Sequence, residues 1–265
     1  MKISVILTNF NGDKYLKTSI ESFLSQSYQE KELIIIDGIS TDNSWKIIED
    51  YQQKNPDLIK WIKEKDSGIS NARNIALKQS SGDLIGFLGC DDILHKDFFK
   101  EANYYFNLSK NFDVIYFNNY CIGQSYAFNL ATQYYPTIRN LIKHCPIASG
   151  ESFYYRKSIF DIFKFNENNK YSMDYELNLA IASTKKNNVK NFLFYPVDLV
   201  AVFNQDTGEN QSSANSIKQR LESICVQLKY CKNFLQSFCI LFRARNLIFK
   251  NYSLFLTIHN NFNSK

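Results

Sequence analysis

The first 95 residues alternate short apolar runs with helical segments, and this alternation limits the possible folds more than any other feature. The apolar runs cover residues 3–8, 32–37, 59–63 and 84–88, and helical periodicity covers residues 13–26, 43–53 and 70–80. Such alternation is the pattern of βαβ units, whose parallel strands are buried on both faces. The sequence therefore predicts an α/β fold with a mainly parallel, doubly wound sheet.

Polar residues follow three of these predicted strands, at the point where each strand ends. They are Thr8, Asn9, Asn11, Asp37, Asp91 and Asp92. Open α/β sheets bind ligands at the carboxyl ends of their strands, so we expect these side chains to line one crevice. Two structural alternatives stay open: Asn9 and Asn11 serve only a turn, and Asp42 serves only as a helix cap.

Asp91 and Asp92 are adjacent carboxylates that come just after the fourth apolar run. Neighbouring carboxylates repel each other unless a proton or a cation lies between them. Oxygen ligands suit Mn²⁺ or Mg²⁺, and these ions commonly hold the phosphates of a substrate. The pair therefore predicts a divalent metal site, with a solvated loop after a strand as the structural alternative.

The second half of the chain is less regular and ends in a basic helical stretch. We expect helices at residues 97–108, 137–143 and 173–183, and strands at 114–118, 150–156, 190–195 and 197–203. Residues 216–249 have a helical pattern that places Leu and Phe beside Lys and Arg. Two interpretations are open: this stretch closes the core, or it lies peripherally on the inner face of the cytoplasmic membrane.

The composition narrows the environment and the partners of the protein. Six cysteines without a CxxC pair or zinc-ligand spacing indicate reduced thiols, and a formal net charge of +5 is mild. The amino terminus enters a strand directly, without the features of a signal peptide. No apolar run approaches the ~18–20 residues that cross a bilayer. We therefore expect a cytoplasmic protein that does not act on nucleic acid.

Four motifs in order give the chain a resemblance to a known enzyme family. They are residues 4–11 (SVILTNFN), 32–42 (ELIIIDGISTD), 64–74 (EKDSGISNARN) and 82–92 (GDLIGFLGCDD), with weaker similarity at 146–160 and 173–177. The chain resembles the family 2 glycosyltransferases with the GT-A fold, of the bacterial O-antigen, capsule or exopolysaccharide type. The resemblance implies residues 1–215 as the GT-A domain, with a nucleotide-binding half (1–95) and an acceptor half (96–215). Residues 216–265 would form a basic amphipathic helical extension.

The resemblance also implies an activity and its partners. Such enzymes transfer a sugar, with inversion, from a nucleotide-diphosphate donor such as a UDP-sugar to a hydroxyl of a polysaccharide or undecaprenyl-linked acceptor. The residues implied in donor binding are Thr8, Asn9, Asn11, Asp37, Asp66, Gly68, Arg73 and Asp91. Asp91 and Asp92 would hold Mn²⁺ or Mg²⁺ between the donor's phosphates.

One position departs from the family pattern of Asp-x-Asp, because Gly89 stands where the first aspartate is usual. An alternative function is therefore a catalytically inactive nucleotide-sugar-binding module. The resemblance implies Asp174 as the general base that takes the proton of the acceptor hydroxyl. A carboxylate that only stabilises a helix amino terminus is the structural alternative for Asp174. Other candidate bases are Glu151 and Glu176, and the lone histidines His95 and His144.

Overall fold

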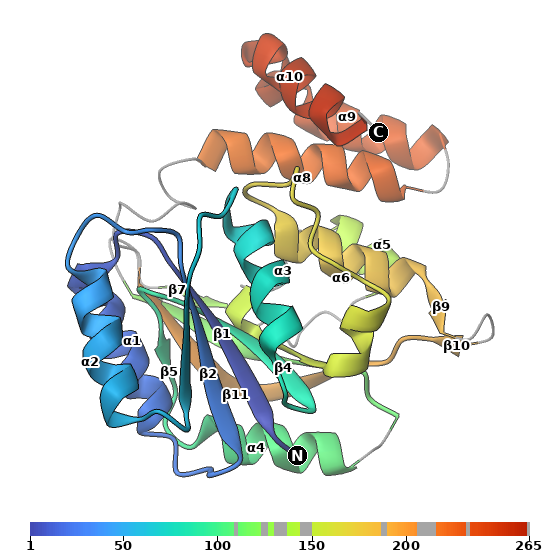
Figure 1. The fold of residues 1–265 in the computed structure, drawn as a ribbon. Coiled ribbons are helices and arrows are strands. Elements are labelled where there is room, and N and C mark those ends of the chain that lie inside the picture. The colour runs from blue at the N-terminus through green and yellow to red at the C-terminus, as the bar shows by residue number, and fades with distance from the viewer. Residues whose placement is uncertain are drawn as a thin grey trace.

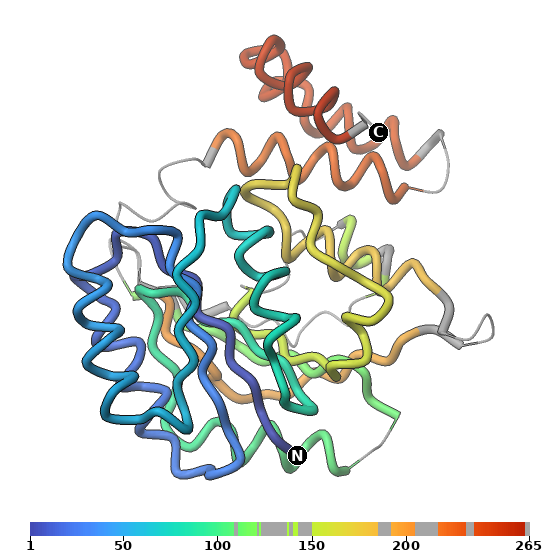
Figure 2. The backbone as a smooth tube through the Cα atoms, viewed as in Figure 1, coloured from blue at the N-terminus to red at the C-terminus, as the bar shows by residue number. Residues whose placement is uncertain are grey.

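The computed structural model describes residues 1–108, 111–122, 127–129, 137–143, 150–186, 190–205, 216–231 and 234–263. Helices cover both faces of a twisted central sheet, and three further helices stack at one end (Figure 1). Figure 2 shows this helical end lying opposite the amino terminus. The predicted boundary at residue 215 falls outside the described residues and stays a prediction.

Nine of the described strands form the central sheet, which is parallel in its first half. The strands are β1 (Ile3–Asn9), β2 (Lys31–Asp37), β3 (Ile59–Lys63), β4 (Leu84–Gly89), β5 (Ile93–Leu94), β6 (Val114–Ile122), β7 (Ala127–Asn129), β8 (Phe153–Arg156) and β11 (Phe194–Gln205). Their order is β3-β2-β1-β4-β8-β6-β11-β5, with β7 paired to β6. β8 runs antiparallel to both neighbours, whereas β11 is parallel to β6. The order in which β1 lies between β2 and β4 confirms the predicted doubly wound half.

Each central strand contributes alternate side chains to two separate hydrophobic cores. On one face, Val5 and Leu7 pack with α1 (Asp13–Leu24), α2 (Ser44–Lys54) and α4 (Phe98–Leu108). On the other face, Ile6 and Phe87 pack with α3 (Ile69–Gln79) and α6 (Met173–Ser183). A short helix, α5 (Ile138–Lys143), adds Leu141 to this second core. Burial on both faces explains why these strands read as continuous apolar runs.

Three expectations for the second half of the chain differ from the structure. Residues Gly150–Ser152 form a 3₁₀ turn, and only Phe153–Arg156 of the expected strand 150–156 are extended. The two strands expected at 190–203 are β10 (Lys190–Asn191), paired to β9 (Lys185–Lys186), and the long strand β11. β11 continues through Pro196, which is paired in register with Tyr116, and register shifts follow between Val197 and Val202.

The helical stretch expected at residues 216–249 forms two helices, and a third helix follows it. They are α8 (Ser216–Tyr230), α9 (Phe234–Lys250) and α10 (Tyr252–Asn263). Leu221, Cys225, Ile240 and Phe255 join them in a core of their own. No helix in the described part of the chain is long and apolar enough to cross a membrane.

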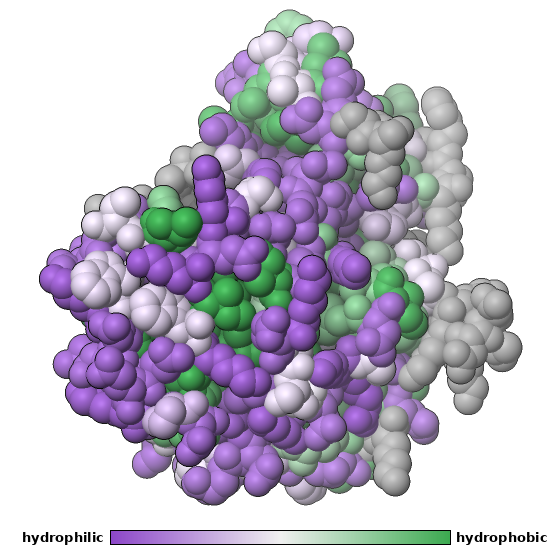
Figure 3. All heavy atoms as spheres, in the orientation of Figure 1, coloured by the Kyte–Doolittle hydropathy of each residue, from purple (hydrophilic) through white to green (hydrophobic). Residues whose placement is uncertain are grey.

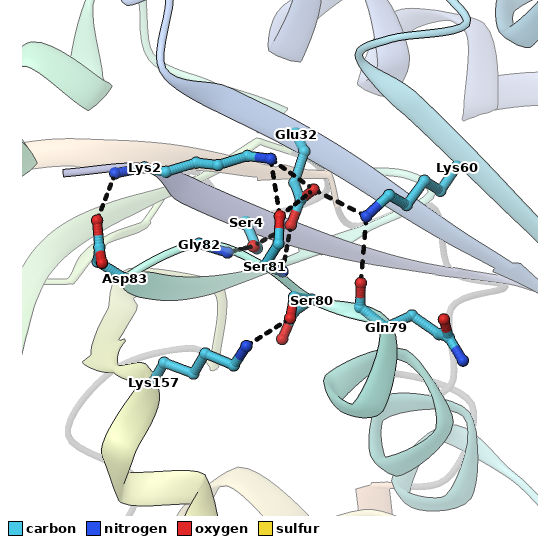
Figure 4. A network of polar contacts seen from close by, with 10 residues as sticks. All are labelled: Lys2, Ser4, Glu32, Lys60, Gln79, Ser80, Ser81, Gly82, Asp83 and Lys157. Atoms are coloured by element: carbon cyan, nitrogen blue, oxygen red, sulfur yellow. Dashed lines mark hydrogen bonds and ion pairs between the residues drawn. The ribbon is translucent and has the colours of Figure 1, made fainter.

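The amino-terminal edge of the sheet is held by a buried carboxylate, Glu32 (Figure 4). It accepts hydrogen bonds from the Ser4 hydroxyl and the Ser81 N–H, both at 2.6 Å, and pairs with Lys2 at 2.9 Å and Lys60 at 3.1 Å. Burial alone would raise the pKa of Glu32, but the hydrogen bonds from Ser4, Ser81 and Lys2 hold it well below its usual range. Glu32 therefore joins β1, β2, β3 and the turn before β4.

Glu32→Gln is expected to lower the free energy of unfolding at pH 7 by about 1–3 kcal/mol, because charge-assisted hydrogen bonds are lost in a buried site. The depressed pKa of Glu32 means that its stabilisation is present above its unfolded pKa of about 4.3 and is lost as the pH falls further. Urea unfolding at pH 7 and pH 3 should therefore show a smaller difference at the lower pH. Glu30→Gln, at an exposed neighbouring position, should change little; equal losses in both variants would contradict this role.

Candidate active site

The carboxyl ends of β1, β2 and β4 lie in register at one edge of the sheet. Asn9 is paired with Asp37, and Thr8 is paired with Gly89. The turns that follow these strands therefore start at the same level. The predicted crevice residues Thr8, Asn9, Asp37, Asp91 and Asp92 accordingly gather at this edge.

Asp37 is fully buried and is fixed by its neighbours. Its Oδ1 accepts hydrogen bonds from Asn9 Nδ2 at 2.9 Å and from the Ser40 hydroxyl at 2.5 Å, and its Oδ2 accepts from the Ser40 N–H at 3.1 Å. The buried Oδ1 of Asn9 has no hydrogen-bond partner among the described residues. Thr8 is half-buried next to them.

Two other polar residues of this edge have structural tasks. Asn11 has a φ of 53°, and its Oδ1 accepts a 2.8 Å hydrogen bond from the Thr41 N–H, which joins two turns. Asp42 accepts hydrogen bonds from the N–H groups of Asp13 at 3.0 Å and Ser44 at 2.9 Å. Asp42 therefore stabilises the starts of α1 and α2, as its structural alternative predicted.

Phe10 is an exposed aromatic side chain beside the Asp37 turn, with 65% of its surface accessible. A Cβ on Gly38 would lie 3.4 Å from the Phe10 ring and 2.7 Å from Asp66 Oδ2. The Phe10 ring and the Asp66 carboxylate therefore flank the backbone of Gly38, which has no side chain. This arrangement suits the binding of a flat polar group. The sequence interpretation missed Phe10, although a large aromatic residue between two asparagines at a strand end is a visible signal.

The loop between β3 and α3 closes one side of this region. Asp66 accepts a 2.8 Å hydrogen bond from the Gly68 N–H, and Gly68 has a φ of +123°, which few other residues adopt. Lys170 reaches this loop from the segment before α6, and its Nζ donates to the Ser67 carbonyl at 2.6 Å. The β3–α3 loop and the second half of the chain are thus in direct contact.

Asp91 and Asp92 both approach the backbone of Gly89. A Cβ on Gly89 would lie 2.6 Å from Asp92 Oδ2 and 2.9 Å from Asp91 Oδ1. Asp92 is buried and Asp91 is half-buried. The glycine that replaces the usual aspartate therefore leaves room for two carboxylates to converge.

The environment of these carboxylates fits a divalent cation. Burial raises the pKa of Asp91, although its own backbone N–H opposes the shift, and a cation would offset that cost of desolvation. Burial, with the charges of Asp91 and Asp92, raises the pKa of Cys90 to about 12. No cluster of three or more His, Cys, Asp or Glu side chains that could hold a metal occurs in the described ranges. A cation here would therefore need oxygen ligands from a substrate as well.

Arg73 joins two more carboxylates next to this pair. Its side chain is only 5% exposed, and its two terminal nitrogens bond Asp174 Oδ1 and, at 3.3 Å, Glu151 Oε1. The guanidinium lies over the rings of Phe87, at 4.6 Å, and Phe165, at 5.3 Å. Arg73 is therefore held from both sides by aromatic rings and carboxylates. Arg73 thus lies between Asp174 and Glu151. Its predicted contact with the donor stays a prediction.

Asp174 and Glu151 differ in their surroundings. A Cβ on Gly150 would lie 2.3–2.5 Å from the Asp174 carboxyl group, so only glycine fits there without displacing it. Asp174 Oδ2 has no hydrogen-bond partner among the described residues, and the side chain is 21% exposed. Burial raises the pKa of Glu151; Arg73 opposes this shift, while the charges of Asp174 and Asp91 add to it. Three carboxylates from separate segments thus share one electrostatic environment.

The remaining candidate bases are placed elsewhere. Glu176 is buried, accepts hydrogen bonds from Asn166 and Asn169 at 3.0 Å, and pairs with Lys229 of α8 at 2.7 Å. His95 packs against Phe203, with ring centres 5.9 Å apart. His144 lies outside the described residues. Among the carboxylates considered, only Asp174 and Glu151 therefore contact Arg73.

Glu222 of α8 fixes the segment that leads to Asp174. It accepts hydrogen bonds from the N–H groups of Lys170 at 3.0 Å, Tyr171 at 2.7 Å and Ser172 at 3.1 Å. α6 begins directly after Ser172. The sequence interpretation missed this contact, although Glu222 is the one acidic residue among residues 216–265.

The sequence profile of glycosyl transferase family 2 matches residues 4–163, which include the sheet edge, Gly89, Asp91 and Glu151. The chain belongs to this family. Family 2 membership confirms the resemblance of the four motifs. Asp174 lies just beyond the matched residues, in α6.

Proteins of Bacillus subtilis and Staphylococcus aureus are among its curated relatives. The minor teichoic acid biosynthesis protein GgaB of Bacillus subtilis is 30% identical over 196 residues, which cover 69% of this chain and 21% of GgaB. The poly(ribitol-phosphate) β-N-acetylglucosaminyltransferase TarS of Staphylococcus aureus is 33% identical over 104 residues, which cover 38% of this chain and 18% of TarS. The chain thus corresponds to about a fifth of each relative.

Two solved structures show that the fold is shared. The crystal structure of S. aureus TarS residues 1–349 with UDP-GlcNAc superposes with a TM-score of 0.70 at 20% identity, covering 96% of this chain and 76% of that chain. The mannosyltransferase PcManGT of Pyrobaculum calidifontis, with GDP-Man and Mn²⁺, gives 0.65 at 16% identity, covering 98% and 73%. These likenesses confirm the expected GT-A fold with added carboxyl-terminal helices.

Proposed function

We propose that this chain transfers a sugar, with inversion, from a UDP-sugar to a hydroxyl group of a cell-surface polymer or its lipid-linked precursor. One observation carries the proposal: the carboxylates of Asp91, Glu151 and Asp174 share one site at the carboxyl edge of β4. Such a transfer needs a carboxylate that can hold a phosphate-binding cation and a second carboxylate that can act as base.

The nucleoside would bind at the edge formed by β1 and β2. Phe10 offers a ring on which a base can stack, and Asp37 is a buried carboxylate held in one orientation. Asp66 and Gly68 would close the β3–α3 loop against the nucleotide, with Thr8 and Asn9 near the ribose. UDP is the proposed nucleotide because the TarS structures contain UDP or UDP-GlcNAc.

The diphosphate would bind next to Asp91 and Asp92. When bound there, Mn²⁺ or Mg²⁺ would offset the negative charge that the leaving diphosphate gains. Mn²⁺ accompanies the nucleotide in the solved complexes of PcManGT and of glucosyl-3-phosphoglycerate synthase from Mycobacterium tuberculosis. The residues of this chain supply two convergent carboxylates and leave the other ligand positions to the donor.

Asp174 would act as the general base. Arg73 donates a hydrogen bond to Asp174 Oδ1 and so fixes the carboxylate. Asp174 Oδ2 can then accept the proton of the acceptor hydroxyl while the hydroxyl oxygen attacks the sugar. Glu151 lies on the other arm of Arg73 and in the field of Asp91.

The proposed acceptor follows from the relatives. GgaB and TarS are named for teichoic acid and poly(ribitol-phosphate), which are polymers with many hydroxyl groups. We therefore propose a polymer hydroxyl, on a glycan or an undecaprenyl-linked precursor, as the attacking group.

Calorimetric titration of UDP, GDP and UMP into the protein, with and without Mn²⁺, tests the donor site. We expect UDP to bind only with Mn²⁺, and more tightly than GDP. UMP should bind more weakly than UDP because it lacks the second phosphate that the cation would join. Binding that is equal for UDP and UMP, or independent of Mn²⁺, would overturn the metal-linked donor site. Incubation with UDP-sugars would then show whether free UDP is released. If the UDP-sugars bind but none of them releases UDP, the inactive binding module is favoured.

A further inference from the structure

α9 carries large apolar side chains on two opposite faces. One face buries Ile240 and packs Leu247 against the core shared with α8 and α10. The other face exposes Phe238 to 54%, Phe242 to 56% and Phe249 to 87%. Positions 238, 242 and 249 lie within about 40° of one another around a helix, so the three rings form one stripe. Monomeric soluble proteins rarely leave such a row of aromatic side chains without a partner.

Cationic side chains lie within and beside this stripe. Arg245 falls on the same helix face, and its guanidinium lies 4.2 Å from the centre of the Phe242 ring. Arg245, Asn246, Phe249 and Lys250 line a surface hollow of about 350 Å³. Figure 3 shows hydrophobic side chains in green among hydrophilic ones on the helices at the top of the view, where α9 and α10 lie. The face is therefore both apolar and positively charged.

The charges of the chain are separated along its length. Residues 216–265 contain eight Lys and Arg but one acidic residue, a net charge of +7, whereas residues 1–215 carry a net charge of −2. That one acidic residue, Glu222, is 3% exposed and bonded to the segment before α6. In the described part of α8, α9 and α10, no exposed carboxylate therefore offsets the basic side chains. A partner of this surface should be anionic.

We infer that the exposed face of α9, formed by Phe238, Phe242, Arg245, Phe249 and Lys250, docks on an anionic lipid bilayer. Aromatic rings in line with basic side chains suit a helix that lies along the bilayer surface, with rings at the acyl boundary and cations at the lipid phosphates. α9 has 17 residues and includes three basic side chains, so it is a surface helix and not a spanning one. The inference rests on α9 and on the charge of residues 216–265, and it is independent of the proposed reaction.

Co-sedimentation of the full chain with lipid vesicles tests this docking surface. We expect binding to vesicles that contain phosphatidylglycerol, weak binding to phosphatidylcholine alone, and a loss of affinity at high salt. Phe242→Ser with Phe249→Ser should weaken binding by about tenfold or more, because two apolar side chains no longer leave water. Arg245→Gln with Lys250→Gln should weaken binding to the anionic vesicles several-fold for each charge removed.

Tyr104→Ser is the matched control, because Tyr104 is an equally exposed aromatic residue, at 56%, on α4. It should bind vesicles like the unchanged protein, and circular dichroism should show every variant folded. No binding to anionic vesicles, or equal binding by the phenylalanine variant and the control, would overturn the inference. Sedimentation velocity addresses a second copy of the chain: a dimer that the phenylalanine variant dissociates would assign the face to self-association and also overturn the inference.

Discussion

Asp174→Asn is expected to lower turnover by about 10²–10⁴-fold while leaving the affinity for UDP unchanged. Asparagine has the same size and can still accept the hydrogen bond from Arg73, but it cannot take a proton from the acceptor. Asp174 Oδ1 is bonded to Arg73 and its Oδ2 has no partner among the described residues, so the loss should fall on the chemical step. Release of UDP measures turnover, and calorimetry measures donor affinity.

The structural alternative for Asp174 predicts a different result. A carboxylate in the first turn of α6 that only interacts with the helix dipole would change stability by about 0.3–1 kcal/mol, without a large effect on turnover. Asp161→Asn, at an exposed site on a nearby 3₁₀ turn, provides the control for a lost surface charge. Unchanged turnover in Asp174→Asn would transfer the role of base to Glu151, and Glu151→Gln would then carry the defect.

Asp91→Asn is expected to abolish Mn²⁺-dependent binding of UDP and, with it, sugar transfer. The burial that raises the pKa of Asp91 also adds a pH dependence. Cation binding requires the ionised carboxylate, so Mn²⁺ affinity of the unchanged protein should fall on acidification at a higher pH than an ordinary aspartate would give. In the variant this component of the pH dependence should be absent.

The stability of the Mn²⁺-free protein gives a second and independent readout for Asp91. A group whose pKa is raised by folding favours the folded state at low pH and costs stability once it ionises. Asp91→Asn removes that cost, so thermal unfolding without Mn²⁺ at pH 7 should occur at a slightly higher temperature. Asp57→Asn, in an exposed turn before β3, should alter neither metal affinity nor stability. A variant that keeps full Mn²⁺-dependent activity would exclude Asp91 as a metal ligand.

The first half of the fold was predictable because its strands are buried on both faces. Ile6 and Ile34 face one core while Val5 and Leu33 face the other, so successive positions are apolar and each run stands out. Parallel strands then bring their carboxyl ends to one edge, which places Asn9 beside Asp37 without knowledge of any side-chain contact. This geometric rule is why the crevice residues could be predicted as a group.

The second half was less predictable because its key contacts join distant segments. The hydrogen bond from Arg73 to Asp174 spans 101 positions in the chain, and that from Lys170 to Ser67 spans 103. Local periodicity carries no information about such pairs. The strand expected at 150–156 was also partly wrong, because Gly150 turns to make room for the Asp174 carboxylate.

The contact between Glu222 and the segment before α6 has a consequence for the timing of synthesis. Ser172 and its acceptor on α8 are 50 positions apart, so a ribosome releases the start of α6 well before it makes its anchor. In a nascent chain, β1, β2 and β4 would thus already be made while the N–H groups of Lys170, Tyr171 and Ser172 still lacked this acceptor. The segment that leads to Asp174, the proposed base, would therefore reach its final position only when α8 had been made.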